Sequence, residues 1–209
     1  MLRATLAFLT LVLASCAGVT AEVTAVRAPE FAGRTFGPIC VSAPDPDLAI
    51  RQNSEAAMAE ALRAVGTTAI ELGTVLFPGK EHGEEVIAAA VRQTGATGFL
   101  VLKPIASWTE DQWIPPTITT TSFMGPGGRR PWAWGYGTTW VSGGYSVTRP
   151  RANIEARLFD VATEETAWLA SIGVTAPAGS SWVDVWRAAG EAAVARLIVD
   201  GLVPSSAAR

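Results

Sequence analysis

The sequence contains little of the chemistry that most metal sites and enzyme sites need. Among 209 residues it has one histidine, His82, and two cysteines, Cys16 and Cys40. A zinc site needs several His or Cys ligands, so zinc is not expected. A Ser–His or Cys–His pair would depend on His82, which lies beside Gly83 at an expected helix start and is interpreted as a solvated surface residue. We therefore predict no catalytic residue, no metal ligand and no cofactor.

An excess of positive charge and a phosphate-binding loop are also missing. Sixteen Lys and Arg stand against nineteen Asp and Glu, a net charge of −3, and no segment concentrates the basic residues. Nucleic acid is therefore not an expected partner. The glycine-rich segments GPGGRRPW and GYGTTW match neither the P-loop nor the dinucleotide-binding pattern. Binding of a nucleotide is not expected either.

Two adjacent carboxylates, Glu110 and Asp111, are the residues that a hydrolase could use. A glycosidase needs a pair of acids on either side of the scissile bond, and these two follow the third expected strand. Adjacent acids at the end of a strand are more commonly solvated, so a hydrolase is the less favoured alternative.

The amino terminus has the pattern of an export signal. Arg3 precedes an apolar run from Leu6 to Leu13, which is too short to cross a bilayer as a helix. Residues 1–15 are therefore predicted to be a signal peptide.

The next four residues, Leu13-Ala14-Ser15-Cys16, resemble the lipobox of bacterial lipoproteins at every position. The resemblance implies cleavage before Cys16, a diacylglycerol on its sulfur and an acyl chain on its new amino group, including palmitate. Several acyl chains make such an anchor persistent. Ala17, in place of Asp, implies an outer-membrane location on the periplasmic face. An ordinary cleaved signal, with Cys16 incidental, is the alternative.

Lipidation of Cys16 would leave Cys40 without a partner in its own chain. Cys40 lies in the apolar segment from Phe36 to Val41, so we expect a small buried thiol. A reactive thiol or a bridge between chains is the alternative.

Alternating elements predict a layered α/β domain with a mixed sheet and about three packed helices. Residues 17–35 form a tether in which VTAVRA could add an edge strand. Strands are expected at 35–43, 67–72 and 95–108, and helices at 47–65 and 84–95. Asp45 is expected to cap the first helix, with Pro46 at its first position.

The carboxyl-terminal part has the pattern of a β-hairpin followed by a helix. Ile154, Ala156 and Leu158 alternate with polar residues, and Trp168, Ala170, Ile172 and Val174 do the same on the return strand. Ser181 and Asp184 have the spacing of a capping box, which predicts a closing helix over 182–200 that packs on the sheet.

The whole arrangement resembles a family of small bacterial envelope lipoproteins with a domain of unknown function. The segments that carry the resemblance are the lipobox, TGATGFLVLKPI, ANIEARLFDVATEETAWLASIG and RLIVDGLVP. More distantly it is similar to the amino-terminal domain of TolB and to lipoproteins that activate penicillin-binding proteins. The resemblance implies a lipidated tether over 16–35 and one α/β domain over 36–204, with a Tyr- and Gly-rich insertion over 108–148.

That insertion carries the candidate binding surface, whose aromatic residues are Trp132, Trp134, Tyr136, Trp140 and Tyr145. The first four have even numbers, so in an extended chain they share one face. Gly143-Gly144 is expected to be a two-residue turn that pairs Trp140 with Val147. The aromatic face would then cover the domain's own core edge, contact a protein or glycan, or lie on the lipid surface.

Taken together, these observations predict a non-enzymatic lipoprotein that acts as an interaction or assembly module of the cell envelope. Its expected partners are the membrane, through the lipid anchor, and an envelope protein or glycan. A peptidoglycan-binding module that uses the aromatic arm is the alternative.

Overall fold

The described part of the chain, in a computed structural model, comprises residues 18–80, 82–122 and 137–204. For 118–122 and 137–141 only the backbone is described. The strands are β1 (Thr20–Arg27), β2 (Ile39–Ser42), β3 (Ala69–Glu71), β4 (Gly98–Ile114), β5 (Thr117–Ser122), β6 (Gly137–Ser142), β7 (Tyr145–Asp160) and β8 (Thr166–Thr175). The helices are η1 (Pro29–Phe31, a 3₁₀ turn), α1 (Leu48–Ala64), α2 (Leu72–Val75), α3 (Glu84–Gln93) and α4 (Trp182–Val199).

The main sheet has six strands in the order β1-β8-β7-β4-β2-β3. β2 is parallel to both β3 and β4, whereas β4, β7, β8 and β1 pair antiparallel. The two parallel pairs need crossover connections, which α1 and the α2–α3 segment supply. The predicted α/β class with a mixed sheet, a hairpin and a final helix is therefore confirmed.

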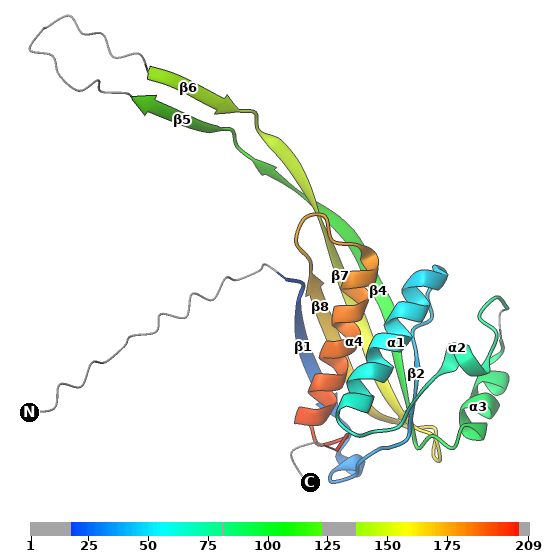
Figure 1. Cartoon of the computed structure of the whole chain (residues 1–209). Coiled ribbons are helices and arrows are strands. Elements are labelled where there is room, and N and C mark those ends of the chain that lie inside the picture. Colours follow the sequence, from blue (N-terminus) through cyan, green and yellow to red (C-terminus); the bar gives the residue numbers. More distant parts are fainter. Residues whose placement is uncertain (1–17, 81, 123–136, 205–209) are drawn as a thin grey trace, which may run out of the picture.

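Helices α1 and α4 lie side by side over one face of the sheet, as Figure 1 shows. Gly190 of α4 allows their close approach, because a Cβ on it would lie 2.9 Å from Cγ of Met58 in α1. Helix α3 packs on the opposite face with a smaller apolar cluster around Cys40, Leu72 and Val91. The rest of that face, over β1, β8 and β7, is left to solvent and carries polar residues such as Thr24, Ser171 and Glu155.

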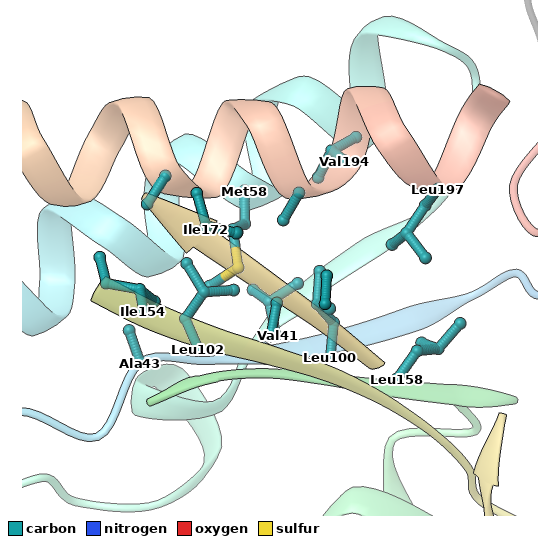
Figure 2. Close-up of a cluster of buried hydrophobic side chains, with 14 of the residues drawn as sticks. Val41, Ala43, Met58, Leu100, Leu102, Ile154, Leu158, Ile172, Val194 and Leu197 are labelled. Carbon is teal, nitrogen blue, oxygen red and sulfur yellow. The ribbon is translucent and has the colours of Figure 1, made fainter. Parts of the chain in front are cut away.

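The main core lies between the sheet and the α1–α4 layer. Strand residues Leu100, Leu102 and Leu158 point toward the helices and are fully buried. Figure 2 shows them together with Met58 of α1, Val194 and Leu197 of α4 and Ile172 of β8. This alternation of buried and polar residues is expected for a sheet with one covered face.

The carboxyl end of α4 is tied to the sheet by Asp200. Its carboxylate accepts a hydrogen bond of 2.8 Å from Nε1 of the buried Trp168 and lies 3.0 Å from Nε of Arg196. Its backbone carbonyl accepts one of 2.9 Å from Nη1 of Arg27 in β1. One residue therefore joins the last helix to two neighbouring strands.

Several local predictions are confirmed. Ile154, Ala156 and Leu158 are buried in β7, as are Trp168, Ala170, Ile172 and Val174 in β8. Ser181 and Asp184 form the capping box of α4. VTAVRA contributes an edge strand, β1, so part of the segment expected as tether belongs to the sheet.

Two boundaries differ from the expectation. The cap of α1 is Asp47 and not Asp45, because the Asp47 carboxylate accepts hydrogen bonds from the backbone N–H groups of Ala49 and Ile50 at 2.8 and 3.3 Å. The strand expected to end at Trp108 continues to Ile114, paired with β7 throughout. Within the described ranges, no helix combines the length and the apolar character required to cross a membrane.

The buried position of Leu100 predicts a large effect on stability. Leu100→Ala is expected to lower the free energy of unfolding by about 2–5 kcal/mol, because it removes buried methyl groups and leaves a cavity in the main core. Val199→Ala is the control, since Val199 is 78% exposed and should change stability little. Urea denaturation followed by circular dichroism measures both, and equal stability of the two variants would contradict this account of the core.

Candidate functional site

The most distinctive part of the molecule is a β-hairpin arm that leaves the main sheet. The pairing of β7 with β8 ends at Arg151 and Thr175, and beyond that level β4 and β7 pair with each other and with no other strand of the described ranges. We call residues 108–114 and 145–151 the proximal arm, and the two-stranded sheet of β5 and β6 the distal ribbon. Figure 1 shows the arm extending well away from the helices.

A bulge marks the base of the arm. Pro104 pairs with Ile154 but Ala106 pairs with Asn153, so Ile105 is an extra residue in β4. A bulge shifts the strand by one position and therefore exchanges its two faces. As a result Trp108 lies on the open face of the sheet, while Ser107 continues the face that the helices cover.

Three aromatic side chains of the proximal arm are exposed to solvent. The exposed fractions are 43% for Trp108, 63% for Trp113 and 57% for Tyr145. Trp113 and Tyr145 lie at the outer end of the proximal arm, and because they occupy adjacent rows of the ladder, their side chains leave opposite faces of the ribbon. The outer end therefore carries one exposed aromatic side chain on each face.

The ladder is interrupted beside these residues. Pro115-Pro116 separates β4 from β5, and Gly143-Gly144 separates β6 from β7 at the same level. Proline has no N–H to donate to a ladder. A Cβ on Gly144 would lie 2.8 Å from Cη2 of Trp113 and 3.0 Å from Cδ of Pro116. The indole of Trp113 therefore packs directly over the Gly144 backbone.

The predicted turn at Gly143-Gly144 is wrong. Trp140 pairs with Thr119, and Val147 pairs with Gln112, so the two glycines break one continuous side of the arm and do not reverse it. The reason is the greater length of β4, which occupies the partner edge of Val147 that a return strand would have needed.

The candidate aromatic residues are only partly within the described structure. Tyr145 is exposed in β7, and Trp140 belongs to β6, where its backbone is extended. Trp132, Trp134 and Tyr136 lie outside the described residues. That Trp132, Trp134 and Tyr136 share one aromatic face with Trp140 therefore stays a prediction.

The distal ribbon presents two free strand edges. β5 pairs with β6 and with no other described strand, and the reverse holds for β6. Proteins commonly protect such edges with charged residues, prolines or bulges. The sequences of β5 and β6, TITTTS and GTTWVS, contain no charged residue and no proline.

Glu110 and Asp111 are not arranged as a pair of acids. They are neighbours in β4, so their side chains leave opposite faces. Glu110 forms an ion pair of 2.5 Å with Nε of Arg151, and the Asp111 carboxylate accepts a hydrogen bond of 2.7 Å from the Thr148 hydroxyl. The geometry of the proximal arm does not favour their acting together on one substrate.

The surroundings of Cys40 and His82 indicate structural roles for both residues. Cys40 is fully buried, and this burial raises the pKa of its thiol to about 12. The nearby negative charge of Glu55 also raises this pKa, whereas a hydrogen bond from the Val41 backbone lowers it. The expected buried thiol is confirmed. Nε2 of His82 lies 3.0 Å from the carbonyl oxygen of Phe77. Among the described residues, no three His, Cys, Asp or Glu side chains are grouped as metal ligands would be.

A cavity of about 310 Å³ lies between α3 and the sheet. Its walls are mainly apolar, with Ile87, Val91, Phe99 and Phe159 among them. Arg92 and Glu164 also line it and form an ion pair of 2.7 Å. Tyr145, the candidate aromatic whose side chain the structure describes, does not contribute to it.

Trp108, Trp113 and Gly144 were not among the binding residues predicted from the sequence. One signal was available: QWIPPTITTTS and GTTWVSGGYS each interrupt a strand-like run with a pair of prolines or glycines. When the sequence is aligned antiparallel with itself about residues 129–130, the proline pair and the glycine pair fall opposite each other. This symmetry indicates a single long hairpin.

Comparison with known proteins assigns this chain to no family. No family model matches the sequence, and no curated protein is similar to it. Among solved structures, the chain is similar to the PelC dodecamer from Paraburkholderia phytofirmans, with 14% sequence identity, a TM-score of 0.47, and coverage of 85% of this chain and 97% of that one. A PelC dodecamer of the same organism with one Leu-to-Met substitution gives 14% identity, a TM-score of 0.46, and coverage of 88% and 99%. A likeness at this level carries no information about function.

The contact between Trp113 and Gly144 predicts different effects for two neighbouring glycines. Gly144→Ala should place its methyl group against the indole and loosen the proximal arm by about 1–3 kcal/mol, since overpacking of this kind costs that much. Gly143→Ala is the matched control, because nothing lies within 4 Å of the added Cβ. Hydrogen exchange of residues 145–148 measures local opening, which we expect to be about tenfold faster in Gly144→Ala alone.

A second substitution tests the cause. In Trp113→Ala the indole is gone and only the 3.0 Å contact with Pro116 remains, so adding Gly144→Ala to it should accelerate exchange much less than it does in the natural chain. Equal exchange in the two single glycine variants would show that Trp113 does not pack over Gly144 in solution.

Proposed function

We propose that this protein is a lipid-anchored, periplasmic, non-enzymatic interaction module of the cell envelope, and that the hairpin arm is its contact element. The observation that carries the proposal is the distal ribbon, a two-stranded sheet held away from the domain, whose two edges pair with no other strand of the described structure. A free edge offers a row of unpaired backbone N–H and C=O groups to a strand of another chain.

The free-energy cost of ordering the backbone supports a contact role for the arm. Fixing the backbone costs about 1–2 kcal/mol per residue, and an isolated two-stranded hairpin is marginal in water. In this chain the proximal arm continues the ladder of β4 and β7, whose inner part is held by the buried Leu100, Leu102 and Leu158. The distal ribbon is therefore joined to the domain through a proximal arm that the core already organises.

The surroundings of the acids support a non-enzymatic role. Glu110 is paired with Arg151, and Asp111 with Thr148, on opposite faces of a solvent-exposed ribbon. A hydrolase would instead need two carboxylates facing one substrate. Turnover of an envelope substrate that is lost in both Glu110→Ala and Asp111→Ala would overturn this part of the proposal.

The lipid anchor is tested separately. Cys16→Ser removes the only sulfur in the lipobox, so the variant should no longer incorporate labelled palmitate and should leave the membrane fraction. Cys40→Ser is the control and should label as strongly as the natural chain, since Cys40 is buried in the domain. Labelling that persists in Cys16→Ser would contradict lipidation at this position.

The contact role of the distal ribbon is tested in cells. A photo-crosslinking amino acid at Thr119 in β5 should give discrete adducts with another protein, whereas the same group at Ser171, on the open face of β8, should not. Identical adduct patterns at the two positions would contradict the proposal.

A glycan partner is favoured by one observation, the exposed Trp113 and Tyr145 rings. Binding of the natural chain to isolated peptidoglycan, reduced in Trp113→Ala and accompanied by no protein adduct at Thr119, would replace the protein partner by a glycan.

A further inference from the structure

The anchor and the arm belong to the same end of the sheet. Thr20, the first residue of β1, pairs with Thr175, Thr175 pairs with Arg151, and Arg151 pairs with Trp108 at the base of the arm. Neighbouring strands lie about 4.8 Å apart, so Thr20 and Trp108 are separated by about 14 Å across the sheet. Cys16 precedes Thr20 by four residues and therefore lies within about 14 Å of it, given about 3.5 Å per extended residue.

This short reach brings a lipid surface close to the arm. Trp113 is five residues beyond Trp108, about 17 Å further along the arm at 3.3–3.4 Å per residue. A membrane that holds an acylated Cys16 thus passes near the end of the sheet from which the arm extends, and not near the opposite end with the β7–β8 turn.

The residues of the arm change in character with distance from the domain. Trp108 and the ion pair of Glu110 with Arg151 lie nearest the domain, and the hydrogen bond of Asp111 with Thr148 follows. Trp113 and Tyr145 follow, on opposite faces of the ribbon. The 37 residues from Gln112 to Thr148 contain two charged residues, Arg129 and Arg130. The average charged fraction of the chain, 17%, would give about six.

This order matches a membrane–water interface. Trp and Tyr favour the headgroup level, because their rings are apolar and carry one polar group. The absence of acids between Asp111 and Thr148 removes repulsion from anionic lipids. At the headgroup level water still reaches the free edges of a ribbon, so no backbone group has to remain unpaired.

We propose that Trp113 and Tyr145 form a lipid-contacting girdle that rests in the headgroup region of the leaflet holding Cys16. The inference rests on the lipid anchor of the proposed function. The girdle supplies a second attachment point, and two points fix the orientation of the domain where the anchor alone would not. The Pro115-Pro116 and Gly143-Gly144 breaks lie next to the girdle, and they let the distal ribbon take a different direction from the proximal arm.

The test uses the lipidated full chain in vesicles of phosphatidylethanolamine and phosphatidylglycerol. On a Cys40→Ala background, an environment-sensitive fluorophore is attached to Ser146→Cys, opposite Trp113, or to Ser171→Cys on the open face of β8. Both positions are exposed serines, so the substitutions are matched. A headgroup-attached nitroxide lipid should quench the fluorophore at 146 at least about twofold more than at 171, since quenching of this kind requires near contact with the headgroups.

Two further measurements separate the outcomes. Adding Trp113→Ala and Tyr145→Ala should reduce the quenching at 146 to the level at 171 while the protein stays on the vesicles. The mass of the purified chain reports acylation of Cys16. An acylated chain with equal quenching at 146 and 171 overturns the girdle and leaves the anchor intact, whereas a chain without acyl groups overturns both.

Discussion

The antiparallel ladder between β4 and β7 is the interaction on which the rest of the molecule depends. It begins at Gly98 and Asp160 in the interior and ends at Ile114 and Tyr145 in solvent. Its inner part forms the middle of the main sheet, packed against α1 and α4. Its outer part has no helix above it, and it is ordered because it continues the inner part. Core packing in the domain and the reach of the arm are thus two properties of one pair of strands.

The bulge at Ile105 decides what the arm presents to its surroundings. Without it, Trp108 and Glu110 would continue the helix-covered face of Leu100 and Leu102. With it, the small Ser107 takes that face beside the buried Ala152, and the indole of Trp108 turns to the open side. One extra residue therefore ends the core and begins a surface, without interrupting the hydrogen-bonded pairing for more than one position.

Sequence reasoning succeeded where a local pattern determines the local structure. The hairpin of β7 and β8 has a period of two, and the Ser181–Asp184 capping box begins α4, so both could be predicted from short segments. The outer part of β4 could not, because TEDQWI has no alternating pattern and is extended only through its partner β7. The role of Gly143-Gly144 depends on Pro115-Pro116 on the other side of the arm, and a glycine pair alone has the signature of a turn. The exposed Trp108 and Trp113 could not be selected from the sequence, because they lie outside the aromatic cluster on which the predicted surface was based.

The position of β1 has a consequence for the order in which the molecule can form. β1 is the first strand to be synthesised, yet its only described partner is β8, and Thr20 pairs with a residue 155 positions later. Contacts so distant in sequence form late, because the intervening chain must first be closed into a loop. Until Thr175 is available, β1 lacks the partner that it has in the folded structure. Pairing of β1 with β8 thus brings the beginning of the described chain onto a strand formed much later in the sequence, and adds the edge of the sheet beside the residue that carries the proposed lipid.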